Sequence, residues 1–374
     1  MKKAIVLGAA MLLAGAAAFA ADVKFSGKFR AGYTFTFEDG DMVSTPKYFD
    51  FANKKYEGRL NFVVSDADGL WSLSIKSLSG SLDSNDKLAT KATVNVGKAL
   101  EKNGLDLNGF GLKFAVGNMK NNALLKAYDN ASGDDRDAFK LFASGDKGYI
   151  TSFTASYDKL TFQVDVDPVS NGEKAAGYAF SAKYADNDLG FAVAAGYAHN
   201  NAAFTDDGDN DCKDGFKLSE QKLDNGFVVS GNVDIAKLAG LDFKLGAGAV
   251  FGYVTEEDVG KGMRVAADLS GGIDAIDGWI EYQYDVVDPD NADKLSNHYL
   301  KANANFNFFA DKGIGLDAYC GASDLENASD YWFFGGDIGY KLGGAAYNLN
   351  VEVANNAATD NVKVAVTPKV TIAW

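Results

Sequence analysis

The chain has 374 residues, which is long enough for two or three soluble domains. It carries 51 Asp and Glu against 36 Lys and Arg, a net charge of −15. This balance argues against nucleic-acid binding, which requires clustered Lys and Arg. The sequence holds only two cysteines, so disulfides do not form the framework of the core.

The first twenty residues have the three parts of a secretory signal peptide. Met1-Lys2-Lys3 is a basic head, residues 4–19 are apolar, and Ala18-Phe19-Ala20 places small residues where signal peptidase reads them. We expect cleavage after Ala20, which leaves residues 21–374 as one mature domain. A membrane anchor is the weaker interpretation, because the apolar stretch is short and alternating sequence follows it directly.

The mature sequence alternates between apolar and polar residues with a period of two, from one end to the other. This period is typical of strands that expose an apolar face on one side and a polar face on the other. We count about eighteen such segments: 23–37, 60–64, 71–75, 92–96, 110–116, 149–157, 160–166, 178–184, 189–197, 227–235, 241–251, 265–269, 280–286, 300–308, 316–320, 332–340, 347–353 and 362–374.

Strands of this kind indicate a membrane-spanning fold. After the signal, no segment offers the roughly 18 continuous apolar residues of a membrane helix, and strands can cross a bilayer only as a closed barrel. We therefore predict an all-β fold, a transmembrane antiparallel β-barrel of 16–18 strands. A soluble sandwich or β-helix is the alternative, although sandwich strands are usually shorter and no fixed-period motif recurs.

The connections between segments also alternate in length. Short Asp-, Asn- and Gly-rich turns are separated by long polar stretches, which is the outer-membrane arrangement of short periplasmic turns and long extracellular loops. An even number of strands then places both termini at the periplasmic end. The short turns lie at 66–69, 158–159, 186–188, 311–313 and 343–344, and the longest polar stretches at 38–56, 118–148 and 199–224.

The polar face of the segments carries many charged residues of both signs. Burying unpaired charge costs several kcal/mol per group, whereas a barrel of this size encloses an aqueous channel. We predict that these residues line a wet pore, the alternative being the solvent face of an open sheet. The candidates are Lys28, Arg30, Arg59, Lys113, Lys183, Lys244, Arg264, Lys301, Asp242, Asp268, Glu281 and Asp317.

Motifs for catalysis or metal binding are weak. The acidic run 206–211 partly mimics a calcium loop, but Cys212 stands where that loop needs Gly and Leu218 where it needs Glu. The two histidines, His199 and His298, have no complete catalytic constellation around them. We therefore predict no enzymatic activity, no cofactor and no metal site. Whether Cys212 and Cys320 pair depends on geometry that the sequence leaves open.

The last strand, residues 361–374, has large apolar residues at even positions apart from Pro368 and stops on Trp374. This resembles the C-terminal insertion signal of bacterial outer-membrane proteins. With the signal peptide and the strand count, the whole chain resembles the porin superfamily of general-diffusion type. The resemblance implies a passive, water-filled channel for small hydrophilic solutes and ions in the bacterial outer membrane. It also implies contact with lipids and lipopolysaccharide, insertion by the barrel-assembly machinery, and a homo-oligomer, commonly a trimer.

The resemblance further implies that the third long loop, 118–148, folds inward and narrows the channel, although an ordinary surface loop is the slightly favoured alternative. Its constriction candidates are Asp134, Asp135, Arg136 and Asp137. We expect weak cation preference, because acidic loops attract cations while the wall is slightly basic. Two other functions stay open: a structural or adhesive barrel, and a substrate-specific channel, for sugars for example. The latter predicts inward aromatic residues, for which Tyr319 and Phe333 are candidates.

Overall fold

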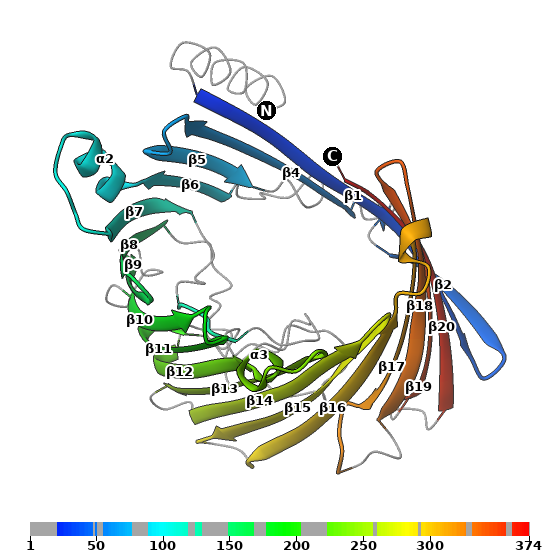
Figure 1. Ribbon diagram of the computed structural model, residues 1–374. Coiled ribbons are helices and arrows are strands. Elements are labelled where there is room, and N and C mark those ends of the chain that lie inside the picture. Colours follow the sequence, from blue (N-terminus) through cyan, green and yellow to red (C-terminus); the bar gives the residue numbers. More distant parts are fainter. Residues whose placement is uncertain are drawn as a thin grey trace.

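The computed structural model describes residues 21–47, 49–50, 55–76, 89–118, 124–128, 149–167, 177–202, 223–256, 260–290, 293–326, 331–356 and 361–373. Within these residues twenty strands form one sheet whose neighbours pair antiparallel, and Figure 1 shows them arranged as a ring. The predicted signal peptide and Trp374 lie outside the described residues.

The ring closes at β1 (Ala21–Glu38), which pairs along both of its edges. One edge pairs with β20 (Asn361–Ala373), from Lys28 opposite Ala373 to Phe37 opposite Val364. The other edge pairs with β4 (Lys55–Asp66) in its first half and with β2 (Asp41–Lys47) in its second half. Since β2 and the short β3 (Phe49–Asp50) only extend the position of β4, eighteen of the twenty strands go round the barrel. The predicted barrel of 16–18 strands is confirmed.

The other strands follow in chain order, each pairing antiparallel with the next. They are β5 (Trp71–Lys76), β6 (Ala89–Val94), β7 (Phe110–Asn118), β8 (Tyr149–Tyr157), β9 (Leu160–Asp167), β10 (Gly177–Asp186), β11 (Phe191–Ala202), β12 (Leu223–Asp234), β13 (Lys244–Glu256), β14 (Gly260–Ile273), β15 (Ile276–Pro289), β16 (Leu295–Phe306), β17 (Ile314–Ala322), β18 (Trp332–Leu342) and β19 (Ala345–Asn356).

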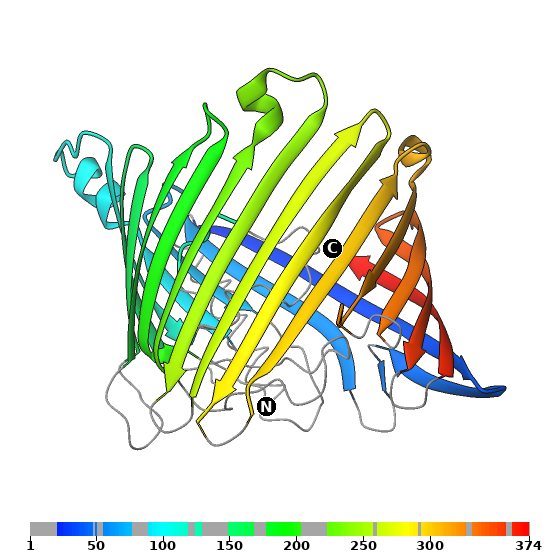
Figure 2. The same cartoon turned by 90° about the horizontal axis from the view of Figure 1, so that it is seen from below.

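One end of the barrel carries short turns and three small helices. Figure 2 shows α2 (Val96–Lys102), α3 (Ile235–Ala239) and η2 (Ala310–Lys312) at this end, which we call the turn end. The sequence predicted strand at Val96 and Ile235, and this was wrong. Each of these residues follows a side chain that caps a helix: Asn95 Oδ1 accepts from Lys98 N at 3.0 Å, and Asp234 Oδ1 accepts from Lys237 N at 2.9 Å.

A second correction concerns residues 38–56, which the sequence predicted as one of the long polar loops. The structure places β2 there, paired with β1 from Glu38 opposite Asp41 to Gly32 opposite Lys47. The hairpin turns at Asp39 and Gly40, which have φ of 51° and 84°. An Asp-Gly pair with both φ positive is the preferred two-residue hairpin turn, because its twist matches that of the strands.

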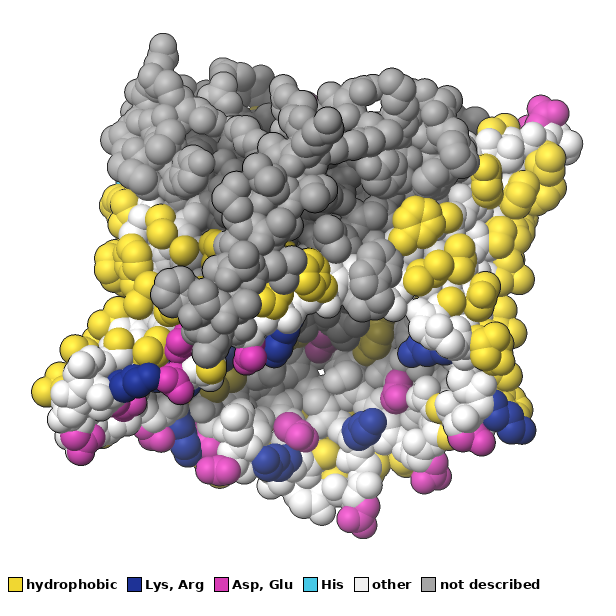
Figure 3. Space-filling view, turned by 90° about the horizontal axis from the view of Figure 1, so that it is seen from above, with side chains coloured by type: hydrophobic (Ala, Val, Ile, Leu, Met, Phe, Trp, Pro, Cys, Tyr) yellow, Lys and Arg dark blue, Asp and Glu magenta, His cyan; other side chains and the backbone are white. Residues whose placement is uncertain are grey.

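The outer face of the barrel is apolar. Side chains of one parity, such as Phe180, Val229 and Phe334, are each 50% exposed although they are large hydrophobic groups. Figure 3 shows apolar side chains over the outer wall and charged ones around a hollow at the turn end, the lower rim in that view. Among the described residues, no helix is both long enough and apolar enough to cross a membrane.

Ile338 tests this assignment of the outer face, since it lies near the middle of β18 and is 48% exposed. We expect Ile338→Arg to lower the free energy of unfolding by about 2–4 kcal/mol, because a cation would face hydrocarbon. Asn348→Arg, on the inner face of β19, should cost less than about 1 kcal/mol. Guanidinium titration of the barrel refolded into liposomes measures both, and equal losses would contradict the assignment.

At the turn end, α2 is tied to the turn between β4 and β5. Lys102 Nζ donates a hydrogen bond to Asp68 Oδ2, and this bond with the Lys102 charge lowers the pKa of Asp68. The same bond raises the pKa of Lys102. A carboxylate with a lowered pKa stabilises the fold above its ordinary pKa, and the contribution is lost as the pH falls through the folded value.

We therefore expect Lys102→Met to return the pKa of Asp68 to the ordinary range of an exposed carboxyl group. Lys98→Met should change it less, because Lys98 contributes only a weaker charge interaction. Carbon-13 NMR titration of the Asp68 carboxyl group measures both variants. An unchanged pKa in Lys102→Met would show that the contact does not persist in solution.

Candidate functional site

The pleat of the strands determines what the barrel interior contains. On β15, Ile280 and Tyr282 are 45% and 37% exposed, whereas Glu281 and Gln283 between them are 0% and 1% exposed. The two parities therefore face opposite sides of the wall. The parity opposite to the apolar outer band is the inner one, and it carries the charged and amide side chains.

Eleven of the twelve predicted wall residues lie in strands. Asp242 does not: it lies exposed in the turn between α3 and β13, because the chain there is helix and turn instead of strand. For Lys28 and Arg59, only their pairing is described, directly opposite each other on β1 and β4. That these residues line a conducting pore stays a prediction. The eleven are Lys28, Arg30, Arg59, Lys113, Lys183, Lys244, Arg264, Lys301, Asp268, Glu281 and Asp317.

Charges on the inner face are mainly segregated by sign. The strands β14 to β19 carry an acidic arc, and in Figure 1 β14 to β16 lie across the ring from β4 to β7. Opposed charges across a channel set up a transverse field that acts on permeating ions. The acidic arc consists of Asp268, Asp277, Glu281, Asp285, Asp317, Asp337 and Glu352; the described basic residues outside it include Arg30, Lys91, Lys113, Lys183, Lys363 and Lys369.

Two basic residues inside the acidic arc, Arg264 and Lys301, contact groups of the wall, while a third, Lys341 on the inner parity of β18, lies exposed near the turn end. Arg264 makes two bonds to Asp285, Nε to Oδ1 at 2.6 Å and Nη2 to Oδ2 at 3.1 Å, and both side chains are buried. Lys301 Nζ lies over the rings of Trp279 and Tyr319, 5.9 and 5.4 Å from their centroids. Asp285 offsets the charge of Arg264, whereas the aromatic rings hold Lys301 without cancelling its charge. Carboxylates still outnumber basic groups on these strands, which leaves this side of the channel acidic.

A segment of the third long loop lies against the inner wall. In residues 124–128, Leu125 N donates to Ser181 Oγ at 3.0 Å and Ala127 N donates to Ser230 Oγ at 3.2 Å. Tyr128 Oη donates to Asp268 Oδ2 at 2.9 Å. We call this segment the inner strap. The inner strap lies inside the barrel, in agreement with the prediction that loop 118–148 folds inward. The constriction candidates Asp134, Asp135, Arg136 and Asp137 lie outside the described residues.

The wall is shaped to receive the inner strap. Leu124 and Tyr128 belong to a buried apolar cluster with wall residues such as Ala198, Val228 and Val250. A Cβ on Gly248 would lie 1.9 Å from the Tyr128 ring, so only glycine lets this ring lie against the strand. Rings also lie over Gly335 and Gly321, where a Cβ would meet Tyr319 Cζ at 2.7 Å and Phe333 Cζ at 2.6 Å, but it would also meet the backbone oxygens of Val351 at 2.6 Å and Leu300 at 2.3 Å.

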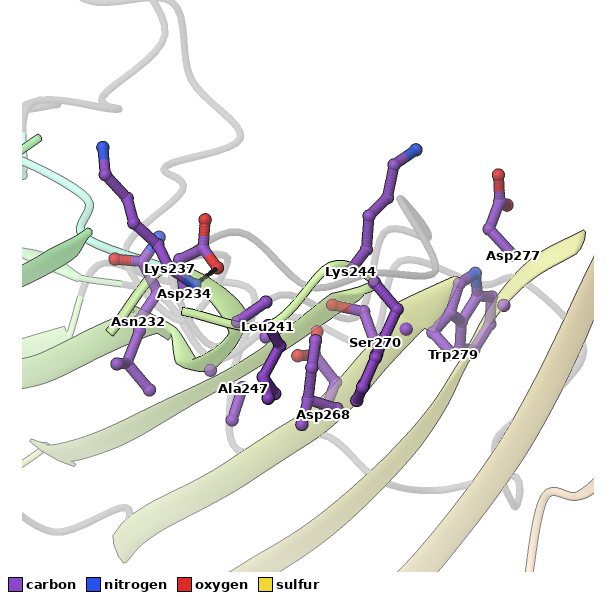
Figure 4. A pocket seen from close by; sticks show the side chains of 18 of the residues that line it. Asn232, Asp234, Lys237, Leu241, Lys244, Ala247, Asp268, Ser270, Asp277 and Trp279 are labelled. Carbon is purple, nitrogen blue, oxygen red and sulfur yellow. Dashed lines mark hydrogen bonds between the residues drawn. The ribbon is translucent and has the colours of Figure 1, made fainter. Parts of the chain in front are cut away.

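Below Tyr128, toward the turn end, the wall is hollowed by a recess of about 840 Å³ lined by β12 to β15 and α3. Figure 4 shows its side chains, among them Lys244, Asp268, Asp277 and Trp279. Sequence reasoning missed Tyr128, Trp279, Asp277 and Asp285. The parity of β15 could have revealed the last three, because they alternate with Ile280, Tyr282 and Tyr284.

The cysteines and histidines singled out in the sequence form no site among the described residues. Cys320 is an exposed, free cysteine on β17, and Cys212 lies outside the described residues. Within the described parts of the chain, no three His, Cys, Asp or Glu side chains gather as a metal ion requires. His298 sits on the outer face, with Nδ1 2.6 Å from Tyr282 Oη, and His199 Nδ1 lies 3.0 Å from Asn225 Oδ1.

No protein-family profile and no curated protein sequence matches the chain. Solved structures do match in three dimensions. OpdL of Pseudomonas aeruginosa superposes with a TM-score of 0.53 at 11% identity, over 94% of this chain and 99% of that one. The chain has the fold of the bacterial outer-membrane porins.

Two further structures match to the same degree. OccK2 (OpdF) of Pseudomonas aeruginosa gives a TM-score of 0.52 at 13% identity, over 94% of this chain and 98% of that one. OmpT, an outer membrane protein of Vibrio cholerae, gives 0.51 at 13% identity, over 95% and 98%. The resemblance to porins that the sequence suggested is confirmed at the level of the fold.

Docking of the inner strap can be tested at Gly248. We expect Gly248→Leu to displace the Tyr128 ring and release the inner strap, which should increase the conductance of an open channel. Gly315→Leu is the matched control, since a Cβ at that inner position of β17 would meet nothing within 4 Å. Single-channel recording measures both, and identical conductance would mean that the inner strap does not narrow the passage.

Proposed function

We propose that the protein is a channel of the bacterial outer membrane that lets small hydrophilic solutes and ions diffuse passively. The observation that carries this proposal is the closed barrel of eighteen strands whose inner face is charged and whose outer face is apolar. Barrels of 16–18 strands enclose an aqueous channel, whereas eight strands are filled by side chains. A charged inner wall is stable when water reaches it.

Passage is governed by size and by charge. The inner strap occupies part of the interior next to Asp268, so solutes pass beside an acidic wall. We propose weak cation preference, because the acidic arc and the net charge of −15 both attract cations. No catalytic step is part of the proposal: the protein contributes a shaped, charged passage.

Location and partners follow from the same architecture. The apolar outer band fits the hydrocarbon of a membrane, and the structural neighbour OmpT is an outer membrane protein. We propose lipids and lipopolysaccharide as the surroundings of the barrel. The amphipathic last strand, ending at Trp374, would be recognised by the barrel-assembly machinery, and a trimer is the proposed assembly by analogy with porins.

A substrate-specific channel is the second candidate, and the partly exposed ring of Tyr319 on the inner face favours it; Tyr299 and Phe333 behind it are buried, with 1% and 9% exposure. Tyr299 and Phe333 stack at 6.4 Å, and Tyr319 lies 6.4 Å from Phe333. Tyr319 Oη donates to Glu352 at 2.9 Å and accepts from Asn350 Nδ2 at 2.9 Å. Rings beside carboxylate and amide groups can hold a hydrophilic solute more firmly than a plain polar wall does. The adhesive alternative depends on long loops that lie outside the described residues.

The reversal potential across a KCl gradient tests the channel and its selectivity together. Asp317 lies directly opposite Asp337 in the β17–β18 pair, so the double variant Asp317→Asn/Asp337→Asn removes two neighbouring charges from the acidic arc. We expect its reversal potential to shift toward anion preference. Asp274→Asn, in the turn between β14 and β15, should leave it unchanged.

Folding must be verified independently of conductance, by β-sheet circular dichroism and heat-sensitive gel mobility. Folded wild-type protein that produces no conductance steps in a planar bilayer would overturn the channel proposal. Conducting protein with the same reversal potential in all three forms would overturn only the role of the acidic arc.

A further inference from the structure

The recess below Tyr128 has the size and the mixed chemistry of a ligand site. Its volume of about 840 Å³ falls within the range of ligand pockets, roughly 300–1,000 Å³. It combines basic, acidic, amide and aromatic side chains, in contrast to a purely acidic stretch of wall. The proposed channel function explains why the wall is polar, but not why it is hollowed here.

Small residues make the hollow. Lys244 on β13 lies opposite Gly272 on β14, and Gly272 lies opposite Asp277 on β15. In the next row, Gly246 pairs with Ser270, and Ser270 pairs with Trp279. Glycine and serine therefore form the floor between the charged residues of β13 and β15, and Tyr128 bounds the recess on the side of the inner strap.

Opposite charges stand on the two sides of this floor. Lys244 and Asp277 belong to strands separated by β14, and since adjacent strands lie about 4.8 Å apart their backbones are about 10 Å apart. Figure 4 shows both side chains extending to the same side of the sheet. Within the described residues neither forms an ion pair with the other or with a third group.

Each charge is held in place by its surroundings. Asp277 accepts a hydrogen bond at each oxygen, from Asn305 Nδ2 at 2.7 Å and from Asn307 Nδ2 at 3.0 Å, and neutral amide donors orient a carboxylate without cancelling its charge. On the side of Lys244, Lys237 of α3 adds a second ammonium group, anchored by its Nζ to the carbonyl oxygen of Asn187 at 2.5 Å, and the carboxylates of Asp234 and Asp242 also line this part of the recess.

Trp279 supplies the apolar surface beside Asp277. It lines the recess next to the glycine and serine floor, and its indole ring already accepts the Lys301 ammonium at 5.9 Å. A solute chain lying across the floor would contact this ring along its methylene groups. Its two ends would then reach the basic and the acidic side.

We propose that the recess is a binding station for linear zwitterions whose ammonium and carboxylate groups are separated by several carbon atoms. The ammonium pairs with Asp277, the carboxylate pairs with Lys244, and the carbon chain crosses the floor beside Trp279. This inference rests on the proposed channel function. It names the class of solute that binds to the channel wall during passage.

Blockade of the open-channel current by four probes tests the proposal. 6-Aminohexanoate carries both charges at the required separation, hexanoate and hexylammonium carry one each at similar length, and glycine is a zwitterion too short to reach both sides. We expect 6-aminohexanoate to interrupt the current at a concentration at least about fivefold lower than any other probe, since each exposed ion pair adds a modest gain. Equal potency of the four probes would overturn the inference.

Variants locate the effect. Lys244→Gln and Asp277→Asn should each weaken blockade by 6-aminohexanoate about fivefold. The exchange Lys244→Asp/Asp277→Lys should restore part of the loss, because the solute can bind in the reverse direction. Lys113→Gln, an inner residue of β7 outside the recess, is the control and should not change the potency.

The outcomes separate this inference from the channel proposal. Folded protein without any open-channel current contradicts the channel itself. Two results with an open channel contradict only the binding station. In the first, 6-aminohexanoate blocks Lys244→Gln and Asp277→Asn as strongly as the wild type. In the second, Lys113→Gln weakens the blockade as much as these two variants do. Each variant is first recorded without probe, so that a loss of blockade is scored only on channels that conduct.

Discussion

The whole structure depends on the satisfaction of backbone hydrogen bonds in a medium without water. A strand edge left open in hydrocarbon would expose a row of unpaired N–H and C=O groups, each costing several kcal/mol. The pairing of β1 with β20 on one edge and with β4 and β2 on the other removes both edges at once. Because the ring of strands must close, the barrel has an interior. Because successive side chains of a strand point to opposite faces, this interior receives the polar residues that the outer face cannot hold.

The interior is organised by strand register. Residues far apart in the sequence become neighbours, as in Arg264 with Asp285 or Tyr319 with Glu352. Arg264 within the acidic arc is paired with Asp285, whereas the basic side chains on β1, β7 and β10 are set apart from the arc. The inner strap lies against the wall at one level of the barrel, and the recess opens below it toward the turn end.

Much of this fold could be read from the sequence, because alternation is a local property that reports the two faces of a strand wherever it occurs. All eighteen segments expected from it correspond to strands of the barrel. Alternation failed at Val96 and Ile235, where the pattern continues into a helix and only the capping Asn95 and Asp234 mark the change. The docking of Tyr128 could not be predicted, since it depends on Asp268, which is 140 residues away, and on the empty space above Gly248.

The glycines beneath the inner aromatic rings have a consequence for how this wall can evolve. The Tyr128 ring covers the strand backbone that Gly248 leaves bare, and any larger residue there would lift this ring into the passage. Gly321 and Gly335 differ, because a Cβ there would also meet the carbonyl oxygens of Leu300 and Val351 on the neighbouring strands. Gly248 and Tyr128 are therefore expected to be gained or lost together among related sequences. Such coupled exchange would let the bore of the barrel change in discrete steps while every strand keeps its register.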